Sequence, residues 1–273
     1  MNHIQIIVPA VSEEISDILI AELSAIGFDG FEETENAVNA FIEEDKFKEA
    51  ELQFLLNGRG LGYQKKLIEK QNWNQLWESN FDRVIVDDFV GIRAEFHEPI
   101  IGVEHEILIT PKMSFGTGHH ATTFMMMQLM REIDFTGKTV FDFGTGTGIL
   151  AILAEKLGAE KVLAVDNDDW CIENAGENIS KNSCSCIEIT KADHTRSKAG
   201  FEIILANINK HIILENIASI DQAINLKGNI LLSGLLIEDE PDIHTAVKSF
   251  GWEHLRTVQR NGWIALQFKK LAP

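Results

Sequence analysis

The first 69 residues show two spacings of apolar side chains, one typical of strands and one typical of helices. Apolar residues at every second position predict a half-buried strand, and apolar residues three or four positions apart predict an amphipathic helix. The expected strands cover residues 4–8, 28–33, 38–42 and 63–69, and the expected helices cover residues 15–26 and 46–56. The order strand, helix, strand, strand, helix, strand predicts a small split βαβ domain with both helices on one face of an antiparallel sheet.

The pattern changes twice beyond residue 69. Residues 70–80 follow neither spacing and are the expected linker, in which Trp73 and Trp77 would share a helix face and pack between domains. Residues 81–273 alternate strands with helices, which predicts a second domain with a doubly wound, mostly parallel sheet. Its expected strands cover 83–86, 90–94, 106–110, 139–141, 161–165, 201–206 and 228–233, its helices cover 122–133, 149–157, 169–179, 212–224 and 241–250, and a hairpin around Asn261-Gly262 follows.

A glycine-rich turn lies at the centre of the second domain. Residues 140–150 predict a strand, a turn and the start of a helix whose free N–H groups face the space above the turn. The glycines of the turn are Gly144, Gly146 and Gly148. The next strand ends in Asp166, 22 residues after the first glycine, the usual place of a carboxylate that binds ribose hydroxyls. Glycine-rich turns also begin helices that bind nothing, but together with Asp166 this turn indicates a nucleotide-like ligand.

The glycine spacing and one acidic residue narrow the class of ligand. Gly-x-Gly-x-Gly is shorter than the Gly-x-Gly-x-x-Gly of dinucleotide-binding enzymes. Asp142 stands two residues before the first glycine, where a carboxylate would repel a pyrophosphate but attract a ligand that carries an ammonium group and a sulfonium. The pattern resembles the S-adenosylmethionine-dependent methyltransferases of Rossmann-like fold.

Two polar residues later in the chain are further candidates for the ligand site. Asn207 follows the expected strand 201–206, at the carboxyl edge where open α/β sheets bind their ligands. Asp193 follows the region that contains the cysteines and is a candidate neighbour of a bound adenine.

No metal site is expected. His119 and His120 lie in a loop rich in glycine and threonine, but metal binding needs a third ligand that neither spacing nor a neighbouring carboxylate supplies. The three cysteines, Cys171, Cys184 and Cys186, lack paired Cys-x-x-Cys spacing, so neither a disulfide framework nor a zinc site is expected.

Composition and charge exclude some classes of protein. With 273 residues and 45% hydrophobic residues the chain can bury a core, and no apolar run approaches the about 20 residues of a membrane span. We therefore expect a soluble, cytoplasmic protein, and a monomer. The net charge of −18 disfavours direct binding to nucleic acid and suits a basic partner. Residues 29–51 hold nine acidic residues against Lys46 and Lys48, so this face is a candidate dock for a basic protein, although a merely solvated face is an equal alternative.

Three stretches together, 115–123, 142–150 and 206–207, resemble the bacterial methyltransferases of ribosomal large-subunit protein eleven (the PrmA family). The resemblance spans nearly the whole chain, including the small N-terminal domain and Trp73, Trp77 and Glu78. It implies a Rossmann-like domain with a doubly wound, mostly parallel seven-stranded sheet, preceded by a ferredoxin-like α+β domain that binds the substrate. His120 keeps the family position, whereas His119 and Ala121 depart from the family's usual loop sequence.

The resemblance also implies a reaction and its residues. S-adenosylmethionine is the expected cofactor, and the amino terminus and lysine side chains of the ribosomal protein are the expected methyl acceptors. The expected cofactor-binding residues, from resemblance and residue chemistry together, are Thr123, Asp142, Gly144, Gly146, Gly148, Asp166, Asp193 and Asn207. The candidate catalytic residues are Asn207, whose side-chain carbonyl can accept an N–H bond from the amine, and His120, a possible proton acceptor that solvent can replace.

Other functions fit the sequence less well. A nicotinamide dehydrogenase needs the longer glycine spacing, and a catalytically silent cofactor-binding module gives no reason for Asn207. Adenine-N6 and glutamine methyltransferases carry Asn-Pro-Pro-aromatic where this chain has Asn-Ile-Asn-Lys at 207–210. A methyltransferase of the same fold that acts on another protein or a small amine stays the alternative.

Overall fold

The computed structural model describes residues 2–9, 13–34, 37–68, 81–111, 116–193 and 200–271 of the chain. The chain forms two compact units, 1–76 and 77–273. The division falls inside 70–80, the expected linker, which lies outside the described residues together with Trp73, Trp77 and Glu78. Phe115, the first residue of the expected His119–His120 loop, also lies outside them. Within the described part of the chain no helix is long and apolar enough to cross a membrane.

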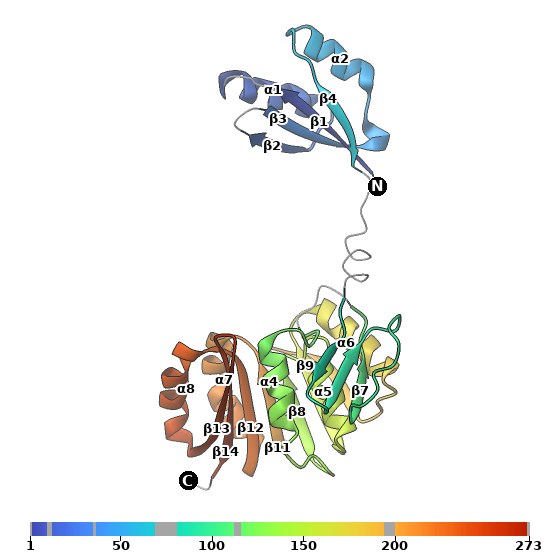
Figure 1. Cartoon of the computed structure of the whole chain (residues 1–273). Coiled ribbons are helices and arrows are strands. Elements are labelled where there is room, and N and C mark those ends of the chain that lie inside the picture. The colour runs from blue at the N-terminus through green and yellow to red at the C-terminus, as the bar shows by residue number, and fades with distance from the viewer. Residues whose placement is uncertain are drawn as a thin grey trace. The chain divides into compact units, whose positions relative to one another are not determined.

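The N-terminal unit is a four-stranded antiparallel sheet with two helices (Figure 1). Its elements are β1 His3–Pro9, α1 Glu13–Ala25, β2 Gly30–Thr34, β3 Ala37–Glu43, α2 Glu49–Asn57 and β4 Gln64–Ile68. The strand order β2-β3-β1-β4 is that of a ferredoxin-like domain, which confirms the predicted fold. Helix α2 begins later than the expected residue 46 because a single 3-10 turn covers Glu44–Lys46.

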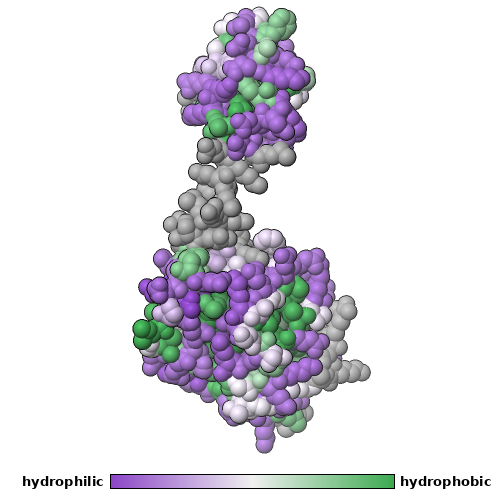
Figure 2. Space-filling view, turned by 90° about the vertical axis from the view of Figure 1, so that its right-hand side faces the viewer, coloured by the Kyte–Doolittle hydropathy of each residue, from purple (hydrophilic) through white to green (hydrophobic). Residues whose placement is uncertain are grey.

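Alternation along the strands builds the core of this unit. Ile4, Ile6 and Val8 of β1 are at most 5% exposed and pair in register with Ile42, Ala40 and Val38 of β3. Leu19 and Leu23 of α1 and Leu52 and Leu56 of α2 complete the same apolar cluster. The face of the unit seen in Figure 2 is mostly hydrophilic. The unit therefore has its own apolar core.

The C-terminal unit is organised around a seven-stranded sheet (Figure 1). Its strands are β8 Thr139–Phe143, β9 Lys161–Asp166, β10 Ile187–Lys191, β11 Phe201–Asn207, β12 Ile224–Leu236, β13 Trp252–Arg260 and β14 Trp263–Lys270. The order is β10-β9-β8-β11-β12-β14-β13, and only the pairs that include β14 are antiparallel. This is the predicted doubly wound, mostly parallel sheet. The chain reverses its direction of progress between β8 and β11, the switch point at which such sheets bind ligands.

Helices cover both faces of the sheet, since the inward side chains of its strands divide between two apolar clusters. The helices are α4 Ala121–Met130, α5 Ile149–Lys156, α6 Asp169–Lys181, α7 Lys210–Ala223 and α8 Glu240–Val247. On β11, Ile203 and Leu205 pack with the cluster that includes α4 and α5, and Ile204 packs with the cluster that includes α7 and α8. The α4 methionines are buried core residues, as the sequence predicts.

Several boundaries differ from the sequence prediction. Strand β10 was not predicted, because this half-exposed edge strand carries too few apolar residues to give a signal. The predicted strands 83–86, 90–94 and 106–110 are present as β5 Val84–Val86, β6 Val90–Arg93 and β7 His105–Leu108, but they form a separate three-stranded sheet. The expected loop between α7 and β12 is absent, since β12 begins at Ile224. Its register with β11 shifts before Asn229, and Lys227 in this part has a φ of 63°.

Two β-bulges interrupt the antiparallel part of the sheet. One lies between Ser233 and Leu235 on β12, at Gly234. The other lies between His254 and Arg256 on β13, at Leu255. The hairpin between β13 and β14 turns at Asn261 and Gly262, whose φ values of 52° and 80° are those that a tight Asn-Gly hairpin turn requires.

Candidate cofactor and substrate site

A cavity of about 760 Å³ lies at the carboxyl ends of β8, β9, β11 and β12. Its volume falls within the range of about 300–1,000 Å³ that is usual for small-molecule sites. Six of the nine residues that the sequence singles out line it, namely His120, Gly144, Gly146, Asp166, Asp193 and Asn207. The other three, Thr123, Asp142 and Gly148, are buried behind the cavity wall.

The glycine turn has a backbone that requires glycine. Gly144, Gly146 and Gly148 have φ values of 75°, 55° and 79°, in the left-handed region that residues with a side chain rarely adopt. A Cβ atom on Gly144 would lie 2.2 Å from the Cγ2 atom of Ile208, and one on Gly148 would lie 3.2 Å from Ala175. The turn therefore brings its backbone close to the cavity on one side and to neighbouring elements on the other.

Ile208 fills space next to a second glycine. A Cβ atom on Gly234, at the bulge of β12, would lie 2.2 Å from the carbonyl oxygen of Ile208. The Ile208 N–H donates to the Ser233 carbonyl at 3.1 Å, which fixes the backbone of Ile208 beside this glycine. Ile208 thus packs where both Gly144 and Gly234 lack side chains. Sequence reasoning missed Gly234, although a glycine after a strand of the switch region is a usable signal.

Asp166 holds the glycine turn in shape. Its Oδ2 atom accepts the Gly146 N–H at 2.9 Å, and its Oδ1 atom accepts the Asp168 N–H at 3.1 Å. Each carboxylate oxygen keeps a further lone pair, so the group can still accept two hydroxyl hydrogens from a ligand in the cavity. This chemistry fits a ribose diol.

Asp142 is a buried carboxyl group behind the turn. It is 1% exposed and accepts a hydrogen bond from Thr145 Oγ1 at 2.6 Å. Desolvation raises the pKa of Asp142 to about 7, the Thr145 bond lowers it, and the charge of Asp166 adds to the rise. Near neutral pH the group is balanced between its two protonation states, so a positive charge in the cavity would shift it toward the carboxylate.

Asn207 presents an acceptor without a partner. The residue is 8% exposed, and its Nδ2 atom donates to Thr123 Oγ1 at 3.3 Å. Its Oδ1 atom is buried and has no hydrogen-bond partner among the described residues. An unsatisfied buried acceptor costs about 1–3 kcal/mol, so its presence in the wall of a cavity points to a ligand that donates an N–H or O–H.

His120 begins helix α4 and caps it. Its Nδ1 atom accepts the Thr122 N–H at 3.4 Å and lies 2.8 Å from Thr122 Oγ1. Burial lowers the pKa of His120, which favours the neutral ring. Because the Nδ1 lone pair serves the cap, the neutral ring carries its hydrogen on Nε2. The ring meets Trp263 edge-on at 4.8 Å between centroids.

Hydrogen bonds bring the separate sequence stretches together. Thr147 Oγ1 of the glycine turn donates to the Gly116 carbonyl at 2.7 Å, which joins the turn to the loop that contains His120. The bond between Asn207 and Thr123 joins that loop's helix to the end of β11. The structure thus places the described parts of the three stretches that carry the family resemblance around one cavity.

Asparagines on one face of α6 support the turn from behind. Asn178 Nδ2 donates to the Thr147 carbonyl at 2.8 Å, and its Oδ1 accepts the Thr110 N–H at 2.8 Å. Asn182, one helical turn later, bonds both the N–H and the carbonyl of Leu108. Asn174, one turn earlier on the same face, is fully buried and lacks a partner for either amide atom among the described residues.

Sequence reasoning missed part of the cavity wall. Trp263, which follows the Asn261-Gly262 turn, and residues of α7 (His211, Glu215 and Asn216) also line the cavity. The α7 residues had a usable signal, since a helix that begins directly after β11 must present its first turns to the same edge. Trp263 had none, because the closing hairpin brings it to the site from a distant part of the sequence.

Comparison with known proteins agrees with this geometry. The family model described as ribosomal protein L11 methyltransferase (PrmA) matches residues 10–271. Proteins named ribosomal protein L11 methyltransferase from Porphyromonas gingivalis and Phocaeicola vulgatus are 39% and 37% identical; the alignments cover 96% and 94% of this chain and 93% and 94% of those proteins. The crystal structure of ribosomal protein L11 methylase from Lactobacillus delbrueckii subsp. bulgaricus is 30% identical with a TM-score of 0.65, over 70% of this chain and 100% of that chain. The chain belongs to the ribosomal protein L11 methyltransferase (PrmA) family.

Proposed function

We propose that this protein transfers methyl groups from S-adenosylmethionine to the α-amino group and lysine side chains of ribosomal protein L11. Membership of the family and the names of the relatives support the substrate. The observation that carries the chemistry is the buried, unpartnered Oδ1 atom of Asn207 in the cavity wall, because an amine substrate supplies the N–H that this atom lacks. Its proposed place of action is the cytoplasm, and its monomeric state stays a prediction.

The residues of the cavity fit the cofactor. Asp166 offers lone pairs to the ribose hydroxyls, and Gly144 and Gly146 allow close approach to the backbone. Asp142 gives a negative charge to balance a cationic ligand, and Asp193 is the proposed neighbour of the adenine. Thr123 is proposed to act through Asn207, which it contacts. When bound, S-adenosylmethionine supplies a methyl group activated by the positive charge on sulfur.

Asn207 is proposed to orient the attacking amine. A neutral amine is required, and an amino terminus with a pKa near 7.7 costs about 1 kcal/mol to deprotonate at pH 7, whereas a lysine near 10.4 costs about 4.6 kcal/mol. The amide Oδ1 can accept one N–H and direct the lone pair, and it does not trap the ammonium form as a carboxylate would. Alignment then provides most of the catalysis.

His120 is better placed to position the site than to accept the proton. The lone pair that a base needs is on Nδ1, which already accepts the Thr122 N–H in the cap of α4. The edge-on contact with Trp263 gives the ring a second, apolar neighbour in the cavity wall. We therefore propose solvent as the proton acceptor and assign His120 a positioning role.

The N-terminal unit is the proposed recognition domain for the basic ribosomal protein. Its acidic face includes Asp29, Glu43 and Asp45 around Lys46, whose pKa is raised by its hydrogen bond to Glu43 and by the neighbouring acids. Lys46 balances one of these three carboxylates, so the four side chains together carry a net negative charge. Such a surface attracts a basic partner and should bind it more weakly as salt rises.

The test of the catalytic assignment is Asn207→Ala. We expect turnover on both amine types to fall about 100-fold, as for the loss of one positioning contact, with a smaller change in cofactor affinity. Asn229→Ala is the matched control, since Asn229 is a half-buried asparagine on β12 that bonds Gln267 away from the cavity. Wild-type turnover of Asn207→Ala at saturating substrate and cofactor would refute the role.

The test of the substrate is mass spectrometry of ribosomal protein L11 after incubation with the enzyme and isotope-labelled S-adenosylmethionine. The proposal expects labelled methyl groups on the amino terminus and on lysines. Labelling of another protein or a small amine, with L11 unmodified, would establish the alternative instead.

A further inference from the structure

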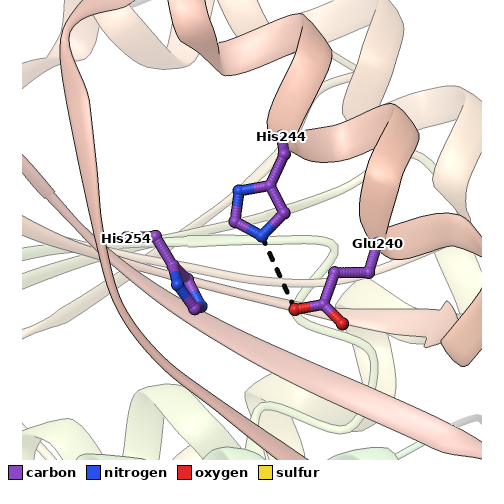
Figure 3. A group of neighbouring side chains, drawn as sticks. All are labelled: Glu240, His244 and His254. Atoms are coloured by element: carbon purple, nitrogen blue, oxygen red, sulfur yellow. Dashed lines mark ion pairs between the residues drawn. The ribbon is translucent and has the colours of Figure 1, made fainter.

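Three side chains with metal-binding chemistry meet between α8 and the edge strand β13, and none of them lines the cavity. Glu240 is the first residue of α8, and His244 lies one helical turn later on the same face. His254 faces them from β13 (Figure 3). One ligand atom from each of the three residues lies within 4.8 Å of the others, and His244 Nε2 is 3.5 Å from Glu240 Oε1.

The bulge of β13 creates this arrangement. In a regular strand, residues three apart point to opposite faces of the sheet. Because Leu255 is an extra residue, His254 pairs with Phe268 and Thr257 pairs with Leu266, two residues apart on β14. His254 and Thr257 therefore share the face that α8 covers. Bulges that re-aim side chains in this way are common at functional sites.

Neighbouring residues hold two of the three side chains in place. Thr257 Oγ1 donates to Glu240 Oε1 at 2.6 Å and lies 2.8 Å from His254 Nε2. The ring of Phe268 lies beneath both imidazoles, with centroids 5.7 Å from His244 and 5.5 Å from His254. A hydroxyl that orients a ligating carboxylate and an apolar floor under the imidazoles are typical surroundings of a metal centre.

We propose that Glu240, His244 and His254 bind one divalent transition-metal ion of the zinc type. Two imidazoles and one carboxylate suit zinc, whereas calcium and magnesium prefer oxygen ligands alone. In a tetrahedral site with bonds of about 2.0–2.1 Å, ligand atoms lie about 3.3 Å apart, close to the 3.5 Å between His244 and Glu240. The widest separation, 4.8 Å, closes with side-chain movement of about 1.5 Å. Water takes the fourth position, since His254 is exposed.

This site is separate from the proposed active site. Thr257, which bonds Glu240, pairs with Leu266, three residues or about 10 Å along β14 from Trp263 in the cavity wall, and His254 pairs with Phe268, two residues further on. A bound ion would tie α8 to the edge strand β13 across the turn Lys248–Gly251 and so stabilise the end of the sheet. The proposal does not rest on the proposed methyltransferase function.

The test is metal uptake by the full-length protein without an affinity tag. After treatment with a chelator, the protein is dialysed against zinc chloride and the bound metal is counted per chain. We expect one zinc ion per chain and a higher unfolding temperature than in chelator. Cobalt(II), used as a coloured substitute, should give the intense visible absorption of a four-coordinate site and lose it when zinc is added.

Variants separate this site from other histidines. His244→Ala and His254→Ala should each lose the bound ion, and Thr257→Val should keep one ion but bind it about 10–100-fold more weakly. His119→Ala is the matched control and should keep full uptake, because His119 is next to another histidine, His120, but does not belong to the Glu240–His244–His254 cluster. The proposal is overturned if the wild-type protein takes up no stoichiometric zinc. It is equally overturned if the His244→Ala/His254→Ala double variant still takes it up.

Discussion

The two units of the protein differ in how many polar groups they bury. Of the ten buried polar or charged residues in the described parts of the chain, nine belong to the C-terminal unit, between Thr122 and Ser233. The tenth, Ser16, belongs to the N-terminal unit. The ion pairs of that unit, such as those of Lys65 with Glu49 and Arg59 with Glu22, lie at the surface.

This difference in buried polar residues indicates which polar groups belong to a chemical site. Buried polar groups reduce stability unless they are paired, so their concentration around one cavity indicates a requirement other than folding. Exposed ion pairs contribute little to stability, so the charges of the N-terminal unit are free to serve association. We therefore expect substitutions in the two units to affect different measurements.

Removal of residues 1–76 should have the largest effect. Each unit has its own apolar core, so residues 77–273 should fold and bind S-adenosylmethionine with unchanged affinity, while methylation of ribosomal protein L11 is lost. Calorimetry with the cofactor and a methylation assay measure the two properties separately. Methylation of L11 by the shortened protein at the full rate would show that residues 1–76 are not needed for substrate recognition.

Asp142→Asn should stabilise the protein without cofactor at neutral and higher pH. The pKa of Asp142 is raised to about 7 in the fold, so the native state favours the protonated form and loses stability as pH rises from about 4 to about 7. A shift of this size corresponds to about 4 kcal/mol, which asparagine would recover while keeping the Thr145 bond.

Urea unfolding of wild type and Asp142→Asn measures this effect. The difference should be greatest at about pH 8 and close to zero at about pH 4. The same substitution should weaken S-adenosylmethionine binding, because the cation loses its charge partner. Equal stability of the two proteins at all pH values would show that the wild-type carboxylate is not destabilised by burial.

Two buried asparagines of α6 test whether a buried amide stabilises the fold only when it has hydrogen-bond partners. Asn178→Ala should destabilise the C-terminal unit by about 1–3 kcal/mol, because it leaves the Thr147 carbonyl and the Thr110 N–H without partners. Asn174→Leu should be nearly neutral or stabilising, because its amide has no described partner to lose. Urea unfolding measures the stability of both variants. A large fall in the free energy of unfolding of Asn174→Leu would contradict this expectation.

The smallest effect is expected at the surface of the N-terminal unit. Arg59 makes two hydrogen bonds to Glu22 between α1 and the end of α2, but both side chains are about one third exposed. Arg59→Ala should leave the urea midpoint of the N-terminal unit nearly unchanged. A clear fall in that midpoint would show that exposed ion pairs do stabilise the N-terminal unit.

The sequence predicted those site residues whose positions follow from the order of strands and helices along the chain. Gly144, Asp166 and Asn207 each stand at the end of a strongly apolar strand, and the ends of neighbouring parallel strands meet at one edge. The contacts of Trp263 with His120 depend instead on a hairpin that joins distant segments. Tertiary packing brings Trp263 and His120 together, and the spacing of residues along the chain does not predict such packing.

The Glu240–His244–His254 cluster shows a second limit. The expectation of no metal site considered the His119–His120 pair and the three cysteines, and it did not weigh this cluster. His254 and Thr257, which both lie beside Glu240, are three residues apart, which in a regular strand places them on opposite faces. Only the bulge at Leu255 brings them to one face. Strand β10 was missed for a simpler reason, since a half-exposed edge strand has little apolar pattern to detect.

The packing of Ile208 against Gly144 and Gly234 has a consequence for how the site can evolve. At Gly144 the steric obstacle to a larger residue is the Ile208 side chain, which a smaller residue at 208 would remove. At Gly234 the obstacle is the Ile208 carbonyl oxygen, which every residue type possesses. A smaller residue at 208 therefore removes the side-chain clash at Gly144 but not the strain of its φ of 75°, and at Gly234 it removes neither the clash with the carbonyl oxygen nor the strain of a φ of 84°. The backbone conformation thus keeps both positions glycine even if Ile208 changes.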